Sequence, residues 1–332
     1  MDNSMNVLLT GGRGFIGKNL VNFFSKKHVR SPLNIDVLTR TETNNLSSKY
    51  RVGFIKGDLL DPSFDFDALV GKYDVIFNCA GELKNEALMH VLHIEATERL
   101  ILACKKVAHA RKKPIHWVQL SSVGAYGPSK PKSNAERFVT EQTLPAPVGT
   151  YEITKTLADE IVMNAVDEYF TYTILRPSNV FGADMPNNSI RQLGNMVKKG
   201  LFFYIGRPGA VSNYVHVDDV AEALVLCGLD PRAKNDVFNL SNDCTQETVI
   251  ESIARFFCVA SPTIRLNENF VRLLVFLFSW IKGFPLKKTR VDALVNRTHY
   301  SNDKINHLLG FSPTRGVTET ITDVLLKHKV KS

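Results

Sequence analysis

The chain has 332 residues and a formal net charge of +8, and 44% of its residues are hydrophobic. This composition excludes a disordered chain and a fibrous repeat, and the length fits one large α/β domain or a core domain with a smaller lobe. The basic residues are dispersed along the sequence, so a basic enzyme with anionic ligands is favoured over a nucleic-acid-binding protein.

The N-terminus has no basic start followed by an apolar run and a cleavage site, so no signal peptide is expected. The five cysteines are Cys79, Cys104, Cys227, Cys244 and Cys258. They are scattered and never spaced as C-x-x-C, which argues against a metal site. We therefore expect reduced cysteines and a cytoplasmic protein.

Short apolar runs alternate with helical patterns in the first half of the chain. Strands are predicted at residues 6–10, 34–39, 52–57, 74–80, 115–122 and 172–178, with helices between them, as at 16–27 and 88–107. This alternation is typical of a parallel sheet with crossover helices. We predict a doubly wound, Rossmann-like dinucleotide-binding domain over residues 1–178.

A glycine-rich turn follows the first predicted strand and opens the first helix. Gly11, Gly14 and Gly17 have the spacing G-x-x-G-x-x-G, a variant of the dinucleotide fingerprint. Glycines there allow a sharp turn, close approach of backbone N–H groups to a pyrophosphate, and tight packing of helix on strand. The turn therefore predicts a dinucleotide cofactor.

The second predicted strand ends in Thr39 and Arg40, where NAD-binding folds usually carry an acid for the ribose 2′-hydroxyl. A 2′-phosphate prefers guanidinium, and Arg13 in the glycine turn can converge on the same group. NADP(H) is therefore favoured. Asp36 keeps NAD(H) as an alternative, because the register of this strand is open.

Three tyrosines precede a lysine by four residues: Tyr126 with Lys130, Tyr151 with Lys155, and Tyr300 with Lys304. Only the second pair lies in a clear helical pattern, because Gly127 and Pro128 interrupt the first and a predicted turn interrupts the third. On that helix Ile153 and Leu157 are predicted to be buried on one side, opposite Tyr151 and Lys155. Lys155 should then be desolvated.

Beyond residue 179 the predicted elements are shorter. A strand runs into a helix over 214–226, with Asp218 or Asp219 expected as its cap, and further helices are predicted at 245–257 and 318–329. We expect residues 179–332 to form most of a smaller substrate-binding lobe, with some elements returning to the core sheet.

Residues 270–288 form an apolar run flanked and interrupted by cations, too short to span a bilayer. A buried helix or a lid over the substrate is favoured. The alternative is an interfacial helix that rests on a membrane.

Seven motifs occur in order along nearly the whole chain: TGGRGFIG (10–17), GDL (57–59), NCAG (78–81), LSSVGAYG (120–127), YEITK (151–155), RPSNVFG (176–182) and YVHVDDVA (214–221). With this ordered set the chain resembles the extended short-chain dehydrogenase/reductase family, especially its nucleotide-sugar epimerases, dehydratases and ketoreductases. The resemblance implies a homodimer formed through a helix pair beside the catalytic helix.

The resemblance implies that Ser122, Tyr151 and Lys155 are catalytic and that Asn179 helps to bind substrate. Motifs and resemblance together give the cofactor-binding residues Gly11, Arg13, Gly14, Phe15, Ile16, Gly17, Arg40, Asp58, Leu59, Cys79, Ala80 and Gly81, with Tyr151 and Lys155. Lys155 is expected to favour the ionised form of Tyr151, which exchanges a proton with the substrate oxygen held by Ser122. Ser121 is expected to be structural.

The family pattern is broken at two positions. Ser212 stands where nucleotide-sugar enzymes commonly have an arginine for the diphosphate, and Arg191, Arg207, Arg290 and Arg297 are possible replacements. His93 stands where many relatives have asparagine, and a substrate contact and a packing role are both open for it.

These features give a leading hypothesis and two alternatives. The first is an NAD(P)-dependent 4-keto reductase or 4-epimerase of a nucleotide-activated sugar. The second is a reductase of an apolar hydroxy or keto substrate, similar to 3β-hydroxysteroid dehydrogenases, suggested by Ser212 and the run at 270–281. The third is a cofactor-sensing binding protein without catalysis, against which the complete Ser122, Tyr151 and Lys155 set argues.

Overall fold

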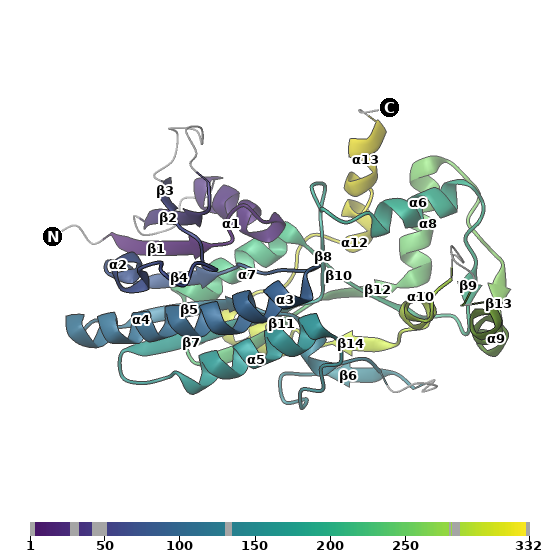
Figure 1. Ribbon diagram of the computed structural model, residues 1–332. Coiled ribbons are helices and arrows are strands. Elements are labelled where there is room, and N and C mark those ends of the chain that lie inside the picture. The colour runs from purple at the N-terminus through teal and green to yellow at the C-terminus, as the bar shows by residue number, and fades with distance from the viewer. Residues whose placement is uncertain are drawn as a thin grey trace.

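A seven-stranded parallel sheet forms the centre of the molecule (Figure 1). The computed structural model describes residues 4–26, 33–41, 52–129, 135–278, 280 and 286–329. In spatial order the strands are β11 (Asp236–Leu240), β7 (Phe170–Pro177), β5 (Ile115–Leu120), β4 (Val75–Asn78), β1 (Met5–Thr10), β2 (Leu33–Thr39) and β3 (Val52–Lys56). The predicted doubly wound sheet is therefore confirmed.

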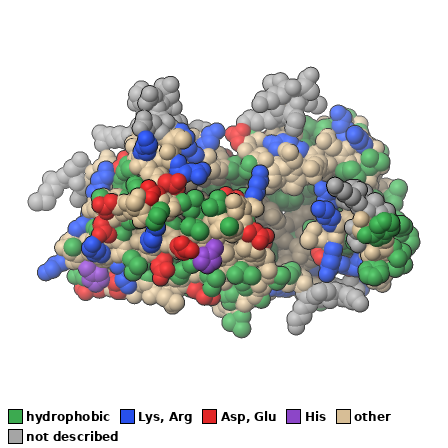
Figure 2. Space-filling view, viewed as in Figure 1, with side chains coloured by type: hydrophobic (Ala, Val, Ile, Leu, Met, Phe, Trp, Pro, Cys, Tyr) green, Lys and Arg blue, Asp and Glu red, His purple; other side chains and the backbone are tan. Residues whose placement is uncertain are grey.

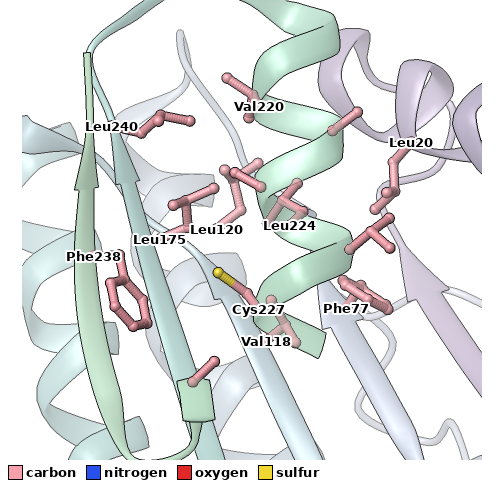
Figure 3. Close-up of a cluster of buried hydrophobic side chains, with 14 of the residues drawn as sticks. Leu20, Phe77, Val118, Leu120, Leu175, Val220, Leu224, Cys227, Phe238 and Leu240 are labelled. Carbon is pink, nitrogen blue, oxygen red and sulfur yellow. The ribbon is translucent and has the colours of Figure 1, made fainter. Parts of the chain in front are cut away.

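The inner strands are apolar because helices cover both of their faces. All residues of β4 and β5 are buried, as expected for strands of a parallel sheet. On one face lie α1 (Phe15–Lys26) and α7 (Val217–Leu229), whose Leu20, Val220 and Leu224 pack on the sheet (Figure 3).

The opposite face is covered by α2 (Phe66–Val70), α4 (Ala96–Arg111) and α5 (Thr150–Asn164). The short helix α3 (Glu86–His90) leads through one π-helical turn, Val91–Glu95, directly into α4. The helix predicted at 88–107 is thus longer than expected and contains this wider turn.

The remaining elements form the lobe and its connections. In one small sheet β10 (Val211–His216) lies between β8 (Asn179–Phe181) and β12 (Asn242–Thr245). Two further pairs join β9 (Tyr204–Ile205) with β13 (Arg265–Leu266), and β6 (Arg137–Val139) with β14 (Thr298–Tyr300). The helices of the lobe are α6 (Ser189–Lys198), α8 (Gln246–Phe257), α9 (Glu268–Phe278), α10 (Lys288–Leu294), α11 (Asp303–Leu309), α12 (Val317–Thr320) and α13 (Asp323–Lys329).

Two elements from the second half of the chain belong to the central sheet and to the helices that cover it. Helix α7 packs against α1, and β11 pairs in parallel with β7 from Asp236 to Leu240. Residues 217–240 therefore return to the central sheet after the chain has passed through β8, α6, β9 and β10.

The expected cap of α7 is wrong. His216 is the N-cap residue, and its Nδ1 accepts the N–H of Asp218 at 3.2 Å. Asp219 is fully buried one turn further on and pairs with Arg315 instead. A buried carboxylate with an arginine partner explains why an aspartate occurs at this position.

Residues 270–288 were expected to form a buried helix or a lid over the substrate, and the buried form is wrong for α9. Within α9 only Val271 and Val275 are buried, and Phe276 is 78% exposed. Residues 279 and 281–285 of this segment lie outside the described residues. Across the described ranges, no helix is both long and apolar enough to cross a membrane.

Candidate active site

A cleft of about 440 Å³ opens at the carboxyl ends of β1, β2, β3 and β4. This edge of a parallel sheet is where α/β folds commonly bind ligands. The lining residues are Gly11, Arg13, Gly14, Leu38, Thr39, Arg40, Thr41, Gly57, Asp58, Leu59, Leu60, Cys79, Ala80, Gly81, Glu82, Leu88 and Leu92. Of the predicted cofactor residues, Phe15, Ile16, Gly17, Tyr151 and Lys155 do not line it.

The glycine turn packs too closely on the neighbouring backbone for side chains at two of its positions. Gly11 has φ +67°, and a Cβ there would lie 2.5 Å from the backbone of Cys79 and Ala80. A Cβ on Gly17 would lie 2.2 Å from the Gly11 carbonyl oxygen, so Gly17 serves close packing of helix on strand. Helix α1 has no acidic residue in its first turn, which leaves its N-terminus suited to an anion.

A buried polar ladder supports the floor of the cleft. Thr10 Oγ1 donates to Asn78 Oδ1 at 2.7 Å, and Asn78 Nδ2 donates to Gln119 Oε1 at 3.1 Å. Thr10 Oγ1 also accepts the N–H of Ala80, at 3.3 Å. These contacts fix the ends of β1, β4 and β5 relative to one another.

The end of β2 presents cations to the cleft. Arg40 is exposed on the rim, and the guanidinium of Arg13 donates to the hydroxyl of Thr41 beside it. Asp36 is turned elsewhere: its Oδ2 accepts the hydroxyl of Tyr73 at 2.7 Å and pairs with Lys72 at 2.6 Å. Asp36 is therefore not a ribose ligand of this cleft. It no longer supports NAD(H) as the alternative cofactor.

Ser122 lies directly after β5 and caps the 3₁₀ turn Val123–Tyr126. Its Oγ accepts the N–H of Gly124 at 3.1 Å. Because the oxygen is the acceptor in this bond, the hydroxyl hydrogen remains available for another group. The side chain is half-buried.

Tyr151 and Lys155 lie on the side of α5 that faces the sheet. Lys155 is 5% exposed, which confirms its expected desolvation, and its Nζ donates to the carbonyl oxygen of Leu120 at the end of β5. Desolvation lowers the pKa of Lys155, and the nearby charge of Asp159 opposes that shift.

Desolvation, with the negative charges of Glu152 and Asp159, raises the pKa of Tyr151 to about 12. The pKa of Tyr151 is thus shifted away from the ionised form that Lys155 was expected to favour, and the causes of the shift are burial and the two carboxylates. At neutral pH Tyr151 is therefore a protonated hydroxyl, that is, a proton donor.

A buried ion pair lies one helical turn beyond Lys155. Asp159 is completely buried, and its Oδ2 accepts Nε and Nη2 of Arg176, each at 3.0 Å, and the hydroxyl of Ser121 at 2.7 Å. Burial raises the pKa of Asp159, while Arg176 opposes the shift. This pair was not predicted from the sequence. A charged residue in an apolar helix face, Asp159, and another in an apolar strand, Arg176, could have indicated a buried ion pair.

The opposite side of α5 differs from expectation. Ile153 is 39% exposed and Leu157 40%, so the second predicted buried face is wrong for the single chain. Leu102, on the neighbouring helix α4, is 60% exposed. In Figure 1 the two helices run side by side over the same face of the sheet.

His93 has both ring nitrogens bonded within the protein. Its Nε2 accepts the N–H of Glu82 at 2.9 Å, so Nδ1 carries the proton and donates to Thr154 Oγ1 at 2.9 Å. Burial lowers the pKa of His93 to about 3, and its ring packs edge-on against Tyr151 at 5.7 Å between centroids. Of the two roles left open for His93, these contacts support the packing role, which links Glu82 at the cleft to α5.

The other two tyrosine–lysine pairs differ from the pair on α5. Tyr126 is fully buried, and its hydroxyl donates to Asn239 Oδ1 at 2.8 Å, while Lys130 lies outside the described residues. Tyr300 ends β14, whereas Lys304 lies in α11 and pairs with Asp236.

On the lobe side, Asn179 is exposed in β8, and its Nδ2 donates to the Asn213 carbonyl oxygen at 3.0 Å. Arg191 and Arg297 bind backbone carbonyl oxygens of nearby loops, and Arg290 binds Gln192. Arg207 is exposed in the turn after β9. Within the described part of the chain its guanidinium makes no hydrogen bond or ion pair, so among these four arginines it is the one available for a ligand.

Comparisons with known proteins agree with this geometry. The sequence profile of the NAD dependent epimerase/dehydratase family matches residues 7–241. The decarboxylating sterol-4-alpha-carboxylate 3-dehydrogenase of Saccharomyces cerevisiae is 26% identical, over 96% of both chains. The dTDP-glucose 4,6-dehydratase of Haemophilus influenzae is 24% identical, over 89% of this chain and 91% of that one.

Among solved structures, a UDP-glucuronic acid 4-epimerase of Bacillus cereus in complex with UDP-glucuronic acid and NAD superposes with a TM-score of 0.73 at 18% identity. It covers 99% of this chain and 100% of that chain, and it supports the fold. With the profile match over most of the sequence, the chain belongs to the NAD-dependent epimerase/dehydratase family and is an enzyme of the oxidoreductase/epimerase type.

Proposed function

We propose that this enzyme acts on a nucleotide-activated sugar as a 4-keto reductase, with 4-epimerisation as the alternative use of the same residues. Three observations carry the proposal. Ser122 lies just beyond the end of β5, and Lys155 Nζ donates to the last carbonyl oxygen of that strand. The Tyr151 ring packs on His93, which accepts the N–H of Glu82 at the cleft. The names of two of the similar proteins contain nucleotide sugars, which supports this substrate class.

The glycine turn and the rim of the cleft are proposed to hold a nicotinamide dinucleotide, whose chemistry is hydride transfer at carbon. Gly11, Gly14 and the α1 N-terminus would hold the pyrophosphate. Arg13 and Arg40 would bind a ribose 2′-phosphate, so we propose that NADP(H) is preferred, with NAD(H) as the alternative.

The three catalytic residues have separate proposed roles. The free O–H of Ser122 would orient the substrate oxygen, and protonated Tyr151 would donate its proton to that oxygen. The ammonium of Lys155 would then stabilise the phenolate left behind. A tyrosine that starts in the protonated form favours reduction of a ketone over removal of a proton from an alcohol.

Arg207 provides a test of the substrate class. We expect UDP or dTDP to protect the enzyme from thermal unfolding, whereas inorganic phosphate does not. Arg207→Ala should weaken that protection, and Arg191→Ala, whose side chain binds loop carbonyl oxygens, should not. If neither nucleoside diphosphate protects the wild type, the nucleotide-sugar proposal fails.

Mass spectrometry of the purified enzyme separates the two reaction types. An epimerase recycles its own hydride and therefore gains from a tightly retained NAD, whereas a reductase must exchange its cofactor in each turnover. Readily exchanged NADPH would support the reductase, and stoichiometric NAD would move the assignment to the epimerase.

A reductase for an apolar hydroxy or keto substrate is the second candidate. Ser212 on β10 supports it, because this uncharged residue stands where nucleotide-sugar enzymes commonly have an arginine. The similarity to a sterol dehydrogenase supports it as well. Saturable turnover of a 3-hydroxysterol, with no protection by UDP or dTDP, would favour it.

We also propose a homodimer through α4 and α5. Their exposed apolar residues, Leu102, Ile153 and Leu157, form a surface that a second copy would cover. Leu157→Glu should convert the dimer to a monomer in size-exclusion chromatography with light scattering. A wild-type monomer at micromolar concentration would contradict the proposal.

A further inference from the structure

The outward face of α9 is almost entirely apolar. Phe270, Leu273 and Leu277 are about half exposed, Phe276 is 78% exposed, and Trp280, just beyond the helix, is 80% exposed. Figure 2 shows hydrophobic side chains gathered at the end of the lobe where α9 lies in Figure 1. We call these five residues the α9 surface. Contiguous apolar surface of this kind marks an interaction site.

The charged residues of α9 point the other way. Arg272 pairs with Glu268 within the helix and with Asp292 of α10, each at 2.8 Å. Val271 and Val275 pack against Val291 on the same side. The ion pairs and two valines thus lie toward the protein, while the phenylalanine and leucine side chains of the α9 surface lie toward the surroundings.

The cleft described above does not account for this surface, since none of its lining residues belongs to α9. Charge argues against a second copy of the chain. Between residues 268 and 292 the sequence has five basic and two acidic residues, so two such surfaces would repel each other. The same charge excess complements an anionic surface.

We infer that the α9 surface docks on the headgroup region of an anionic lipid bilayer, with the helix lying in the plane of the interface. Aromatic and leucine side chains would enter the acyl boundary, and Lys287 and Lys288, both exposed at the start of α10, would meet lipid phosphates. Tryptophan suits this boundary because its ring is apolar and its N–H is polar. This inference does not depend on which substrate the enzyme takes.

Vesicle sedimentation tests the inference with the full-length protein. We expect binding to vesicles of phosphatidylcholine mixed with phosphatidylglycerol, weaker binding to phosphatidylcholine alone, and loss of binding as salt rises. The double variant Leu273→Glu, Phe276→Glu should bind at least about tenfold more weakly, because two exposed apolar side chains that would enter the bilayer become charged.

Leu326→Glu is the matched control. Leu326 is 48% exposed on α13, close to the 53% of Leu273, and its replacement should leave vesicle binding unchanged. Equal loss in both variants would overturn the inference, as would no binding of the wild type to either vesicle. A change of oligomeric state in the α9 variant without vesicle binding would assign the surface to a second copy instead.

The native tryptophans give a readout that needs no destabilising change. Trp117 is fully buried, whereas Trp280 is 80% exposed, so lipid contact should shift and quench only the Trp280 emission. Brominated lipids should quench the wild type, and Trp280→Phe should abolish the quenching while most sedimentation is retained. Unchanged emission of the wild type with bound vesicles would refute docking through this surface.

Discussion

Two aspartate–arginine pairs in the molecule have similar geometry and very different surroundings. Arg232 and Asp230 approach to 2.6 Å at the surface, whereas Arg176 and Asp159 approach to 3.0 Å in the interior beneath α5. The shorter distance does not mark the more important pair. At the surface, water solvates the charge that remains when its partner is removed. In the interior the remaining charge is neither solvated nor paired, which destabilises the folded state.

The contrast extends to the whole of α5. On its inner side Lys155 and Asp159 are buried and hydrogen-bonded to the residues at the end of β5. On its outer side Ile153 and Leu157 are exposed. Polar residues on the inner side hold α5 against the sheet, while Arg40 is exposed on the rim of the cleft. The predictions below test that division.

The largest effect is expected at the reacting group itself. Tyr151→Phe removes the proposed proton donor and should lower kcat by about 10²–10⁴-fold while cofactor binding and stability change little. Tyr300→Phe is the control, because Tyr300 lies outside the proposed site. Turnover preserved in Tyr151→Phe would exclude the proposed mechanism.

The buried pair should dominate stability. Asp159→Asn leaves the Arg176 guanidinium without its charge partner and should lower the free energy of unfolding by about 3–5 kcal/mol, measured by urea denaturation. Asp230→Asn, at the surface pair, should cost less than about 1 kcal/mol. Equal costs would show that burial does not separate the two pairs.

Buried histidines should make the fold sensitive to acid. Burial lowers the pKa of His93 to about 3 and that of His116 to about 4, so both take up protons more readily when the chain is unfolded. Their contribution to stability is complete above about pH 6.5 and is lost as the pH falls from there towards those values, by at most ~1.4 kcal/mol per pH unit for each residue.

Urea midpoints between pH 7 and pH 4.5 measure this dependence. His93→Asn should flatten the slope, and the exposed His307→Asn should leave it unchanged. An unaltered slope in His93→Asn would mean that other groups govern the acid response.

The smallest effect is expected on the rim. Arg40→Ala should weaken NADPH binding by about five- to tenfold, because one charge-assisted contact to a phosphate is lost, and should leave NADH binding unchanged. The dissociation constants of NADPH and NADH can both be measured by cofactor fluorescence. NADH serves as the control, because it lacks the 2′-phosphate. Equal weakening of both cofactors would remove the proposed role in NADP(H) preference.

Much of the first half of the fold was predictable because its elements are encoded locally. Continuous apolar runs such as β5 require helices on both faces, and the glycine turn requires small residues at fixed positions. The buried state of Lys155 followed from the same periodicity.

The sequence could not predict contacts between distant residues. Three examples are the hydrogen bonds of His93 to Glu82 and Thr154, that of Tyr73 to Asp36, and the ion pair of Asp219 with Arg315. Each contact links segments that are separated in the chain. Helical periodicity also could not separate an apolar face buried within one chain from a face left exposed. Both Leu157 and the α9 surface were misassigned for that reason.

The pairing of β11 with β7 has a consequence for biosynthesis. Until residue 240 has emerged from the ribosome, β7 is the last strand of an incomplete sheet, with its edge and apolar face uncovered. The nascent chain must therefore carry the first part of the lobe, from β8 to β10, before its central sheet can close. A fragment that ends at residue 178 would keep the cofactor motifs and lack β11 and α7, so we expect it to aggregate rather than to bind cofactor.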